Sequence, residues 1–288
     1  MIALPASITN EVLTPGLYVL ATPIGNLGDI TLRTLHALQN LDYIYSEDTR
    51  VTQTLLGAYG IRRKLLNYHD HNGAKVRPLI IQQITQGASV GLVSDAGTPL
   101  ISDPGCKLVS AVIHENLCVF SFPGPCAAIA GLTVSGMATD AFRFCGFLPT
   151  TSNQRCLKLK ALSCVSETLI FYETPLRLGA VLSDMHACFG SRQVCVAREL
   201  TKRFEEVVRG SLDDVSIGLS TMTLKGEIVL IVAGCPDKET TPETIDATLV
   251  TILEKHSVKD ASRLVAEMFA RPRQEIYMRA LKLKNVTS

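Results

Sequence analysis

The feature that most constrains the fold of this chain is the regular order of short apolar runs, Gly/Pro-rich turns and helical segments in its first half. The apolar runs predict strands at residues 17–22, 43–46, 89–94 and 118–122. Helices are predicted between them, at residues 31–40, just after Arg50, at 73–86 and up to Glu115. Repeated strand–turn–helix units favour a largely parallel sheet with helices packed on it.

The pattern changes after the turn Pro123-Gly124-Pro125. A helix is predicted over 127–136, and strands follow at residues 143–147, 168–172, 194–198, 206–209 and 227–233. Helices separate several of these strands, so we expect a second α/β unit with a more mixed sheet.

A polar stretch bounded by prolines, residues 235–242, indicates a linker. Three helices are predicted beyond it, at residues 242–254, 259–269 and 273–283. The last two have the spacing of a helix-turn-helix pair, and the chain from Arg271 onward is rich in basic residues. The expected division is an N-terminal α/β domain over 1–122, a second α/β domain over 123–235 and a basic helical extension over 236–288.

Composition narrows the class of protein. The 28 Lys and Arg residues nearly balance the 27 Asp and Glu residues, which argues against a protein that coats nucleic acid non-specifically. The nine cysteines form no Cys-x-x-Cys pair, so free thiols in a reducing compartment are expected rather than a zinc site or disulfides. Residues 116–139 carry no charge, but Pro123-Gly124-Pro125 interrupts them. We therefore expect a cytoplasmic protein without a membrane span.

Neither a P-loop nor a Gly-x-Gly-x-x-Gly pattern occurs in the chain. Gly/Pro-rich turns instead follow the predicted strands directly, and the richest is Ser94–Gly105, SDAGTPLISDPG. Glycines let a backbone approach a ligand closely and prolines fix the shape of a loop. A simple connection needs fewer residues, so this loop is predicted to bind a ligand at the carboxyl ends of the strands.

Nine motifs occur in a fixed order: TPIGNL (22–27), EDTR (47–50), HDHN (69–72), SDAGTPLISDPG (94–105), PGPCAAIAGL (123–132), GFLP (146–149), FYETPLR (171–177), REL-TK (198–202) and GEIVLIV (226–232). Together they resemble the bacterial 16S rRNA cytidine 2′-O-methyltransferase family, within the tetrapyrrole-methylase superfamily. The resemblance extends from about residue 16 to residue 234 and is looser in the C-terminal helices.

The resemblance implies a tetrapyrrole-methylase-like two-domain α/β fold that binds S-adenosylmethionine (SAM) in the cleft between its domains, with a small helical C-terminal extension. It also implies a homodimer that acts on a cytidine in the decoding region of 16S rRNA, within the small ribosomal subunit. Thr98 stands where tetrapyrrole members carry Asp, which favours the RNA branch. The residues that the resemblance assigns to the cofactor are Pro23, Asp95, Gly97, Thr98, Pro99, Ile101, Ser102, Ala127, Ala128, Tyr172, Leu200, Gly226 and Glu227.

A ribose 2′-hydroxyl is a poor nucleophile at neutral pH, so a base or a cation near it would assist methyl transfer. The candidates near the expected cleft are Glu47, Asp48, Arg50, His69, His71, Lys202 and Lys225. We expect Lys202 or His69 to assist deprotonation, the former because neighbouring cations would lower its pKa. Arg50 and Arg177 are expected to hold RNA phosphate.

Simpler interpretations remain open for these candidates. The EDTR segment could serve only to cap the following helix. His69 and His71 share a face of an extended segment, but no third ligand is evident, so a metal site is not expected.

Two other functions stay possible at this point. One is a SAM-dependent C-methyltransferase for a tetrapyrrole ring, against which the missing Gly-Asp-Pro loop and the basic C-terminal helices both count. The other is a SAM- or RNA-binding assembly protein without turnover. A dehydrogenase is disfavoured because no dinucleotide-binding glycine pattern is present.

Overall fold

The computed structural model describes residues 12–219, 225–236, 242–269 and 271–286. Contacts divide the chain into two compact units, Met1–Gly234 and Cys235–Ser288. The two α/β halves therefore belong to one unit, and their boundary at residue 122 stays a prediction. No helix within the described ranges is long and apolar enough to span a membrane.

The first half is built on a five-stranded sheet in the order β3-β2-β4-β1-β5, in which every paired neighbour is parallel. Its strands are β1 (Gly16–Leu20), β2 (Tyr43–Ser46), β3 (Leu65–Asn67), β4 (Ser89–Val93) and β5 (Val119–Phe122). The predicted parallel sheet is confirmed. The short strand β3 was not predicted from the sequence, since only three residues carry its signal.

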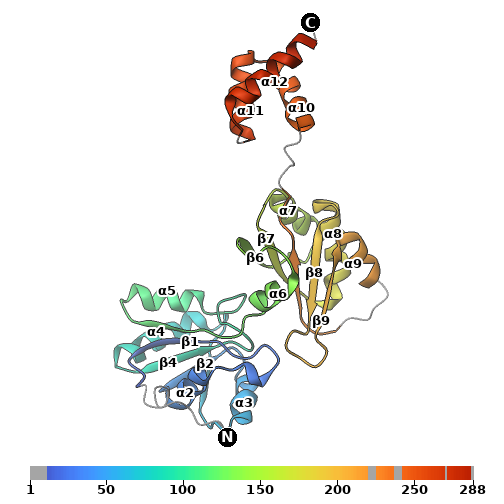
Figure 1. The fold of residues 1–288 in the computed structure, drawn as a ribbon. Coiled ribbons are helices and arrows are strands. Elements are labelled where there is room, and N and C mark those ends of the chain that lie inside the picture. Colours follow the sequence, from blue (N-terminus) through green and yellow to red (C-terminus); the bar gives the residue numbers. More distant parts are fainter. Residues whose placement is uncertain (1–11, 220–224, 237–241, 270, 287–288) are drawn as a thin grey trace. The chain divides into compact units, whose positions relative to one another are not determined.

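Helices cover both faces of this sheet (Figure 1). They are the 3-10 turn η1 (Leu27–Asp29) and the helices α2 (Leu32–Asn40), α3 (Thr49–Ala58), α4 (Gly73–Thr85) and α5 (Cys106–His114). Successive residues of β1 enter different cores: Leu17 packs with the residues of α4 and α5, whereas Tyr18 packs with those of α2 and α3. Side chains alternate across a strand, so both faces of β1 are buried. Thr31 caps α2 through a hydrogen bond from the Thr34 N–H to its Oγ1 (3.1 Å).

The second half contains a mixed sheet in the order β6-β7-β10-β8-β9. Only β6 and β7 are parallel, and the other pairs are antiparallel. The strands are β6 (Phe142–Phe147), β7 (Thr168–Glu173), β8 (Gln193–Arg198), β9 (Glu206–Ser211) and β10 (Ile228–Val232). The prediction of a second, mixed α/β sheet is therefore confirmed.

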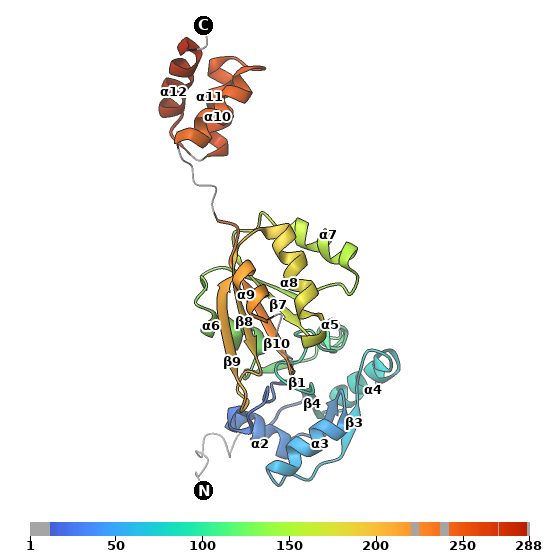
Figure 2. The same ribbon diagram turned by 90° about the vertical axis from the view of Figure 1, so that its right-hand side faces the viewer.

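Helix α6 (Ala127–Ser135) lies on one face of this sheet, and α7 (Ser152–Leu162), α8 (Pro175–Phe189) and α9 (Leu212–Leu219) lie on the other (Figures 1 and 2). The uncharged stretch 116–139 forms β5, a turn and α6. The core beneath α6 also takes in Ile24, which comes from the loop after β1. A side chain from the first half is thus buried among residues of the second, which fixes the two sheets against each other at this point.

The C-terminal unit consists of α10 (Pro242–Leu253), α11 (Val258–Met268) and α12 (Arg273–Val286). Its apolar core is made by side chains of all three helices, Ile245, Leu249, Val265, Ala266, Ile276 and Ala280. The Arg279 guanidinium donates two hydrogen bonds to Asp246, at 2.8 and 2.9 Å, and so joins α12 to α10. The three predicted C-terminal helices are confirmed to within a few residues.

Candidate functional site

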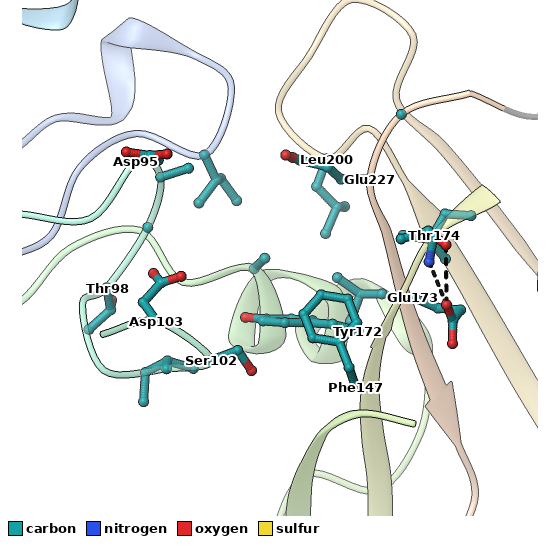
Figure 3. A pocket seen from close by; sticks show the side chains of 18 of the residues that line it. Asp95, Thr98, Ser102, Asp103, Phe147, Tyr172, Glu173, Thr174, Leu200 and Glu227 are labelled. Carbon is teal, nitrogen blue, oxygen red and sulfur yellow. Dashed lines mark hydrogen bonds between the residues drawn. The ribbon is translucent and has the colours of Figure 1, made fainter. Parts of the chain in front are cut away.

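A cavity of about 360 Å³ lies where the carboxyl ends of the first sheet meet the second sheet, a volume in the range of small-molecule sites. Figure 3 shows Asp95, Thr98, Ser102 and Asp103 on one side of it, and Phe147, Tyr172, Leu200 and Glu227 on the other. The described residues that line it are Ile24, Glu47, Asp95, Ala96, Gly97, Thr98, Ile101, Ser102, Asp103, Ala127, Phe147, Tyr172, Glu173, Thr174, Ala197, Leu200, Gly226, Glu227, Ile228 and Val229.

The loop after β4 forms the first wall, and the loop after β1 holds it in place. Thr22 and Gly97 exchange two backbone hydrogen bonds, Thr22 N–H to Gly97 O at 2.9 Å and Gly97 N–H to Thr22 O at 3.0 Å. Further along the loop, Leu100 and Ser102 have positive φ values of 75° and 66°. Residues other than glycine adopt this conformation only at a cost, so the surrounding bonds must hold the loop in its shape.

Thr98 has a structural partner that its sequence position did not reveal. Its hydroxyl donates a hydrogen bond of 2.9 Å to the carbonyl oxygen of Pro125, in the turn that precedes α6. An ionised Asp at this position could not donate a hydrogen bond to that carbonyl oxygen, because both groups are acceptors. The departure from the tetrapyrrole pattern at Thr98 is thus explained by a tie between two loops of the cavity.

The second wall is built around Tyr172. Its ring meets Phe144 and Phe147 edge-on, with centroids 4.9 and 5.7 Å away. Its hydroxyl oxygen accepts a hydrogen bond of 3.2 Å from the backbone N–H of Ala128, at the start of α6. Burial, followed by the effect of Cys126, raises the pKa of this phenol far above its usual value. Tyr172 is therefore a neutral, fixed aromatic surface.

Gly226 closes the second wall at a place where only glycine fits. Its φ is +92°, and a Cβ there would overlap the carboxyl group of Glu199. That carboxyl group accepts the backbone N–H of Glu227 at 3.1 Å and the Lys202 ammonium at 2.7 Å. The glycine thus lets a charged network sit directly behind the cavity wall.

Three carboxylates line the cavity on its first-sheet side: Glu47, Asp95 and Asp103. Burial, reinforced by Asp103 and Asp95, raises the pKa of Glu47. Burial likewise raises the pKa of Asp103, although the Ser94 hydroxyl acts in the opposite direction. Clustered carboxylates around a cavity favour a ligand that carries positive charge.

The structure brings most of the expected cofactor residues together. The expected residues that line the cavity are Asp95, Gly97, Thr98, Ile101, Ser102, Ala127, Tyr172, Leu200, Gly226 and Glu227. Pro23, Pro99 and Ala128 are buried and are not among its lining residues. The cofactor assignment did not include Ile24, Glu47, Ala96, Asp103, Phe147, Glu173, Thr174, Ala197, Ile228 and Val229. Most of these residues lie inside the nine motifs. Assigning every residue of each motif to the cavity would therefore have found them from the sequence.

Lys202 does not have the environment expected of a base. Its ammonium pairs with Glu199 at 2.7 Å and with Glu227 at 3.0 Å. Burial lowers its pKa, but the hydrogen bonds that its ammonium donates to these two carboxylates outweigh burial and raise the pKa. The expectation that neighbouring cations lower the pKa of Lys202 is therefore wrong, because its partners are anions. Lys202 is not among the lining residues, although its side chain packs directly against Gly25.

His69 and Arg50 also lie outside the lining set. The His69 ring faces His71 edge-on at 5.9 Å, and its buried Nδ1 has no hydrogen-bond partner among the described residues. No group of three metal-ligating side chains is found in the described ranges. Arg50 is exposed at the start of α3, where Asp48 caps the helix and pairs with the guanidinium at 2.6 Å. The capping role weighed for the EDTR segment is thus present.

Arg50 also lines a shallow groove, together with Thr49, Gln53, Thr54, Arg63, Lys64 and Leu65. We call it the basic groove.

Arg177, in contrast, is turned inward. Its guanidinium donates to the carbonyl oxygens of Leu148 (2.6 Å) and Pro149 (3.2 Å), and its Nε lies 3.2 Å from Glu173. The expectation that Arg177 binds RNA phosphate is not supported, since its charge is used inside the protein.

Comparison with known proteins gives matches along nearly the whole chain. The family model of Tetrapyrrole (Corrin/Porphyrin) Methylases matches residues 16–216, and that of an RsmI C-terminal HTH domain matches residues 239–284. The chain is 44% identical over 277 residues to the Ribosomal RNA small subunit methyltransferase I of Mesorhizobium japonicum, with 96% of this chain and 94% of that protein covered. It is 41% identical over 268 residues to the protein of the same name from Halalkalibacterium halodurans, with 91% and 93% covered.

Solved structures share the fold at low sequence identity. A cobalt precorrin-4 methyltransferase aligns with a TM-score of 0.56 at 16% identity, covering 75% of this chain and 94% of that one. A diphthine synthase aligns with a TM-score of 0.57 at 12% identity, covering 75% and 89%. At such low sequence identities, the similarity to these structures indicates a shared fold only. Because the family model matches most of the chain and relatives above 40% identity cover nearly all of it, the chain belongs to the Tetrapyrrole (Corrin/Porphyrin) Methylases and groups there with the relatives named Ribosomal RNA small subunit methyltransferase I.

Proposed function

We propose that this protein transfers the methyl group of SAM to the ribose 2′-hydroxyl of a cytidine in the decoding region of 16S rRNA. The observation that carries the proposal is that one cavity collects ten residues which the motifs assigned to the cofactor, drawn from both sheets. The names of relatives at 41–44% identity support small-subunit rRNA as the substrate.

The cavity suits SAM on chemical grounds. SAM carries a positive sulfonium and an ammonium group, and Glu47, Asp95 and Asp103 supply negative charge on one side. Leu200, Phe147 and Val229 offer apolar surface for an adenine ring on the other. When bound, the cofactor supplies an electrophilic methyl carbon.

The task left to the protein is to align an acceptor oxygen with that carbon, which contributes about 7–11 kcal/mol to lowering a barrier when the geometry is right. Rigid walls serve this task. The Thr22–Gly97 backbone pair, the Thr98–Pro125 tie and the Ala128–Tyr172 bond each fix one loop of the cavity.

The substrate RNA is proposed to approach along the groove between α3 and β3. Arg50 and Lys64 are exposed there, and the groove starts on the same turn that carries Glu47. Arg63 is occupied in part, since its guanidinium donates to the carbonyl oxygens of Gln39, Leu41 and Asp42. Exposed cations in a groove favour phosphate contacts without base specificity.

Three further features belong to this proposal. The basic helices of the C-terminal unit are proposed to add RNA contacts, in keeping with the match to an HTH domain. The working form is proposed to be a cytoplasmic homodimer. Its chain is proposed to divide into domains at residues 122 and 235.

The test is to map 2′-O-methyl groups in rRNA from cells with and without the gene, and to repeat the reaction with purified protein. Small ribosomal subunits from the deletion strain and a precorrin are offered separately, each with labelled SAM. Label in a cytidine ribose of 16S rRNA supports the proposal. Label in the precorrin, or SAM binding with no transfer to either, refutes it in favour of a tetrapyrrole methylase or a non-catalytic protein.

A further inference from the structure

Two carboxylates that line the cavity, those of Glu47 and Asp103, make no hydrogen bond or ion pair to any residue that the structure describes. We infer that Glu47 is the catalytic base that accepts the proton of the ribose 2′-hydroxyl. This inference rests on the proposed function, and it replaces Lys202 and His69 in the role expected for them from the sequence.

The titratable side chains that line the cavity in the described ranges are Glu47, Asp95, Asp103, Tyr172, Glu173 and Glu227. Tyr172 accepts the Ala128 N–H and is held neutral. The Oε1 atom of Glu173 accepts the Thr174 N–H at 2.8 Å (Figure 3) and pairs with Arg177, whereas its buried Oε2 has no hydrogen-bond partner among the described residues. Glu227 binds the Lys202 ammonium at 3.0 Å. These three groups are occupied by structural partners.

Two aspartates remain beside Glu47, and only Asp95 has a hydrogen-bond partner among the described residues. Asp95 accepts the backbone N–H of Asp48 at 2.9 Å and is exposed. Burial raises the pKa of Asp103, the nearby Ser94 hydroxyl lowers it, and Asp103 in turn acts on the Tyr172 phenol. Its carboxyl group projects from the cofactor loop toward the cavity (Figure 3), which places it among the groups that would face the cofactor's positive charge.

Glu47 differs from Asp103 in position, because it lies outside the cofactor loop, directly after β2. No hydrogen bond or ion pair joins its carboxylate to any residue that the structure describes. It is half-buried, and the charged groups that act on it, Asp103, Asp95, Asp70 and Asp48, are all acidic. Burial and this like charge raise its pKa, so its carboxylate binds a proton more strongly than an ordinary Glu does. A base with a pKa closer to the working pH takes a proton more effectively.

The position of Glu47 fits the direction from which RNA would come. Glu47 is the first residue after β2, and Thr49 and Arg50, two and three residues further on, line the basic groove. A phosphate held at Arg50 would therefore bring a ribose to the mouth of the cavity beside Glu47. Lys202 lies instead behind the opposite wall, with its ammonium held by two carboxylates.

The reaction balances with these groups alone. The 2′-oxygen forms a bond to the methyl carbon, its proton passes to a Glu47 oxygen, and the electron pair of the broken C–S bond stays on sulfur, which becomes a neutral thioether. Glu47 then releases the proton to solvent. No metal or second cofactor enters the scheme.

The experiment compares Glu47→Gln and Glu47→Asp with the wild type, using small subunits that lack the methyl group. We expect Glu47→Gln to lower the single-turnover rate by about 10²–10⁴-fold, and Glu47→Asp to restore part of it. Binding of S-adenosylhomocysteine, measured by calorimetry, should change by less than about threefold, because that product has no sulfonium charge. Binding of the small subunit should also be retained.

The pH dependence provides a second readout. The wild-type rate should fall as pH drops through the pKa of Glu47, since only the carboxylate accepts a proton, and Glu47→Gln should lack this acidic limb. Asp70→Asn serves as the matched control. It removes one negative charge near Glu47, so it should move the acidic limb to lower pH and leave the plateau rate unchanged.

Three results would overturn the inference. Glu47→Gln could keep a rate within tenfold of the wild type, or it could lose S-adenosylhomocysteine binding, which would assign Glu47 to the cofactor. The acidic limb could also disappear in Asp103→Asn and persist in Glu47→Gln. If the wild type itself methylates no small-subunit ribose, the proposed function fails first, and the two failures are thereby distinguished.

Discussion

Gly226→Ala tests whether the charged network behind the cavity wall is as tightly built as the structure indicates. The φ of +92° costs an alanine at least about 1–2 kcal/mol. The added Cβ would also overlap the Glu199 carboxyl, which must then move away from the Glu227 N–H and from Lys202. These groups are partly exposed, so their loss adds only about 1 kcal/mol.

The expected total is a loss of about 2–3 kcal/mol of unfolding free energy, or about 4–12 °C in Tm for a unit of this size. Because Glu227 lines the cavity, S-adenosylhomocysteine should also bind about tenfold more weakly. Calorimetric scanning and titration measure the two effects.

Gly179→Ala is the matched control, since Gly179 lies in helix α8 with nothing near its missing Cβ. That change should stabilise the protein by about 0.5–1 kcal/mol and leave binding unchanged. If Gly226→Ala behaves like Gly179→Ala, the reasoning about the wall is refuted.

Three further predictions concern single side chains. Tyr172→Phe keeps the ring but leaves the buried Ala128 N–H unpaired, which should cost about 1–3 kcal/mol in a denaturant titration; unchanged stability would show that water replaces the hydroxyl. Arg50→Ala should weaken binding of the small subunit and reduce the slope of log K against log salt by about 0.7–0.9, while the Kd for SAM stays unchanged. The control is Lys107→Ala, on the exposed face of α5. Equal salt slopes in the two variants would contradict the assignment of the groove to RNA phosphate. Lys202→Met should retain the acidic limb of the pH–rate profile, because its ammonium has a raised pKa and is not the base; loss of that limb would restore Lys202 to the role.

Local pattern was enough to predict the elements of this fold. The loop after β4 and the turn before α6 were placed correctly because glycine and proline fix backbone shape over a few residues. The pKa of Lys202 was not predictable in the same way. Glu227 reaches Lys202 only because β10 pairs antiparallel with β8 and thereby brings residues 25 positions apart together. Sequence neighbours such as Arg198 suggested the opposite sign.

Residues with strained backbone conformations are concentrated in the loops that form the cavity. Among the described residues, the non-glycine positions with positive φ are Leu100, Ser102, Asn116, Glu199 and Thr201. All but Asn116 lie in the two loops that form opposite walls of the cavity.

Each strained wall is held by bonds close by. The Thr201 N–H donates to Glu205 at 2.6 Å, and the Glu199 N–H donates to the Glu227 carbonyl at 3.0 Å. On the other wall, the Thr22–Gly97 backbone pair precedes Leu100 and Ser102 in the loop. Strain of this kind persists only where neighbouring contacts offset it, and it keeps a loop in one shape. A methyl transfer gains from walls that do not rearrange when the acceptor arrives, so strain on both sides of one cavity is the arrangement that such chemistry favours.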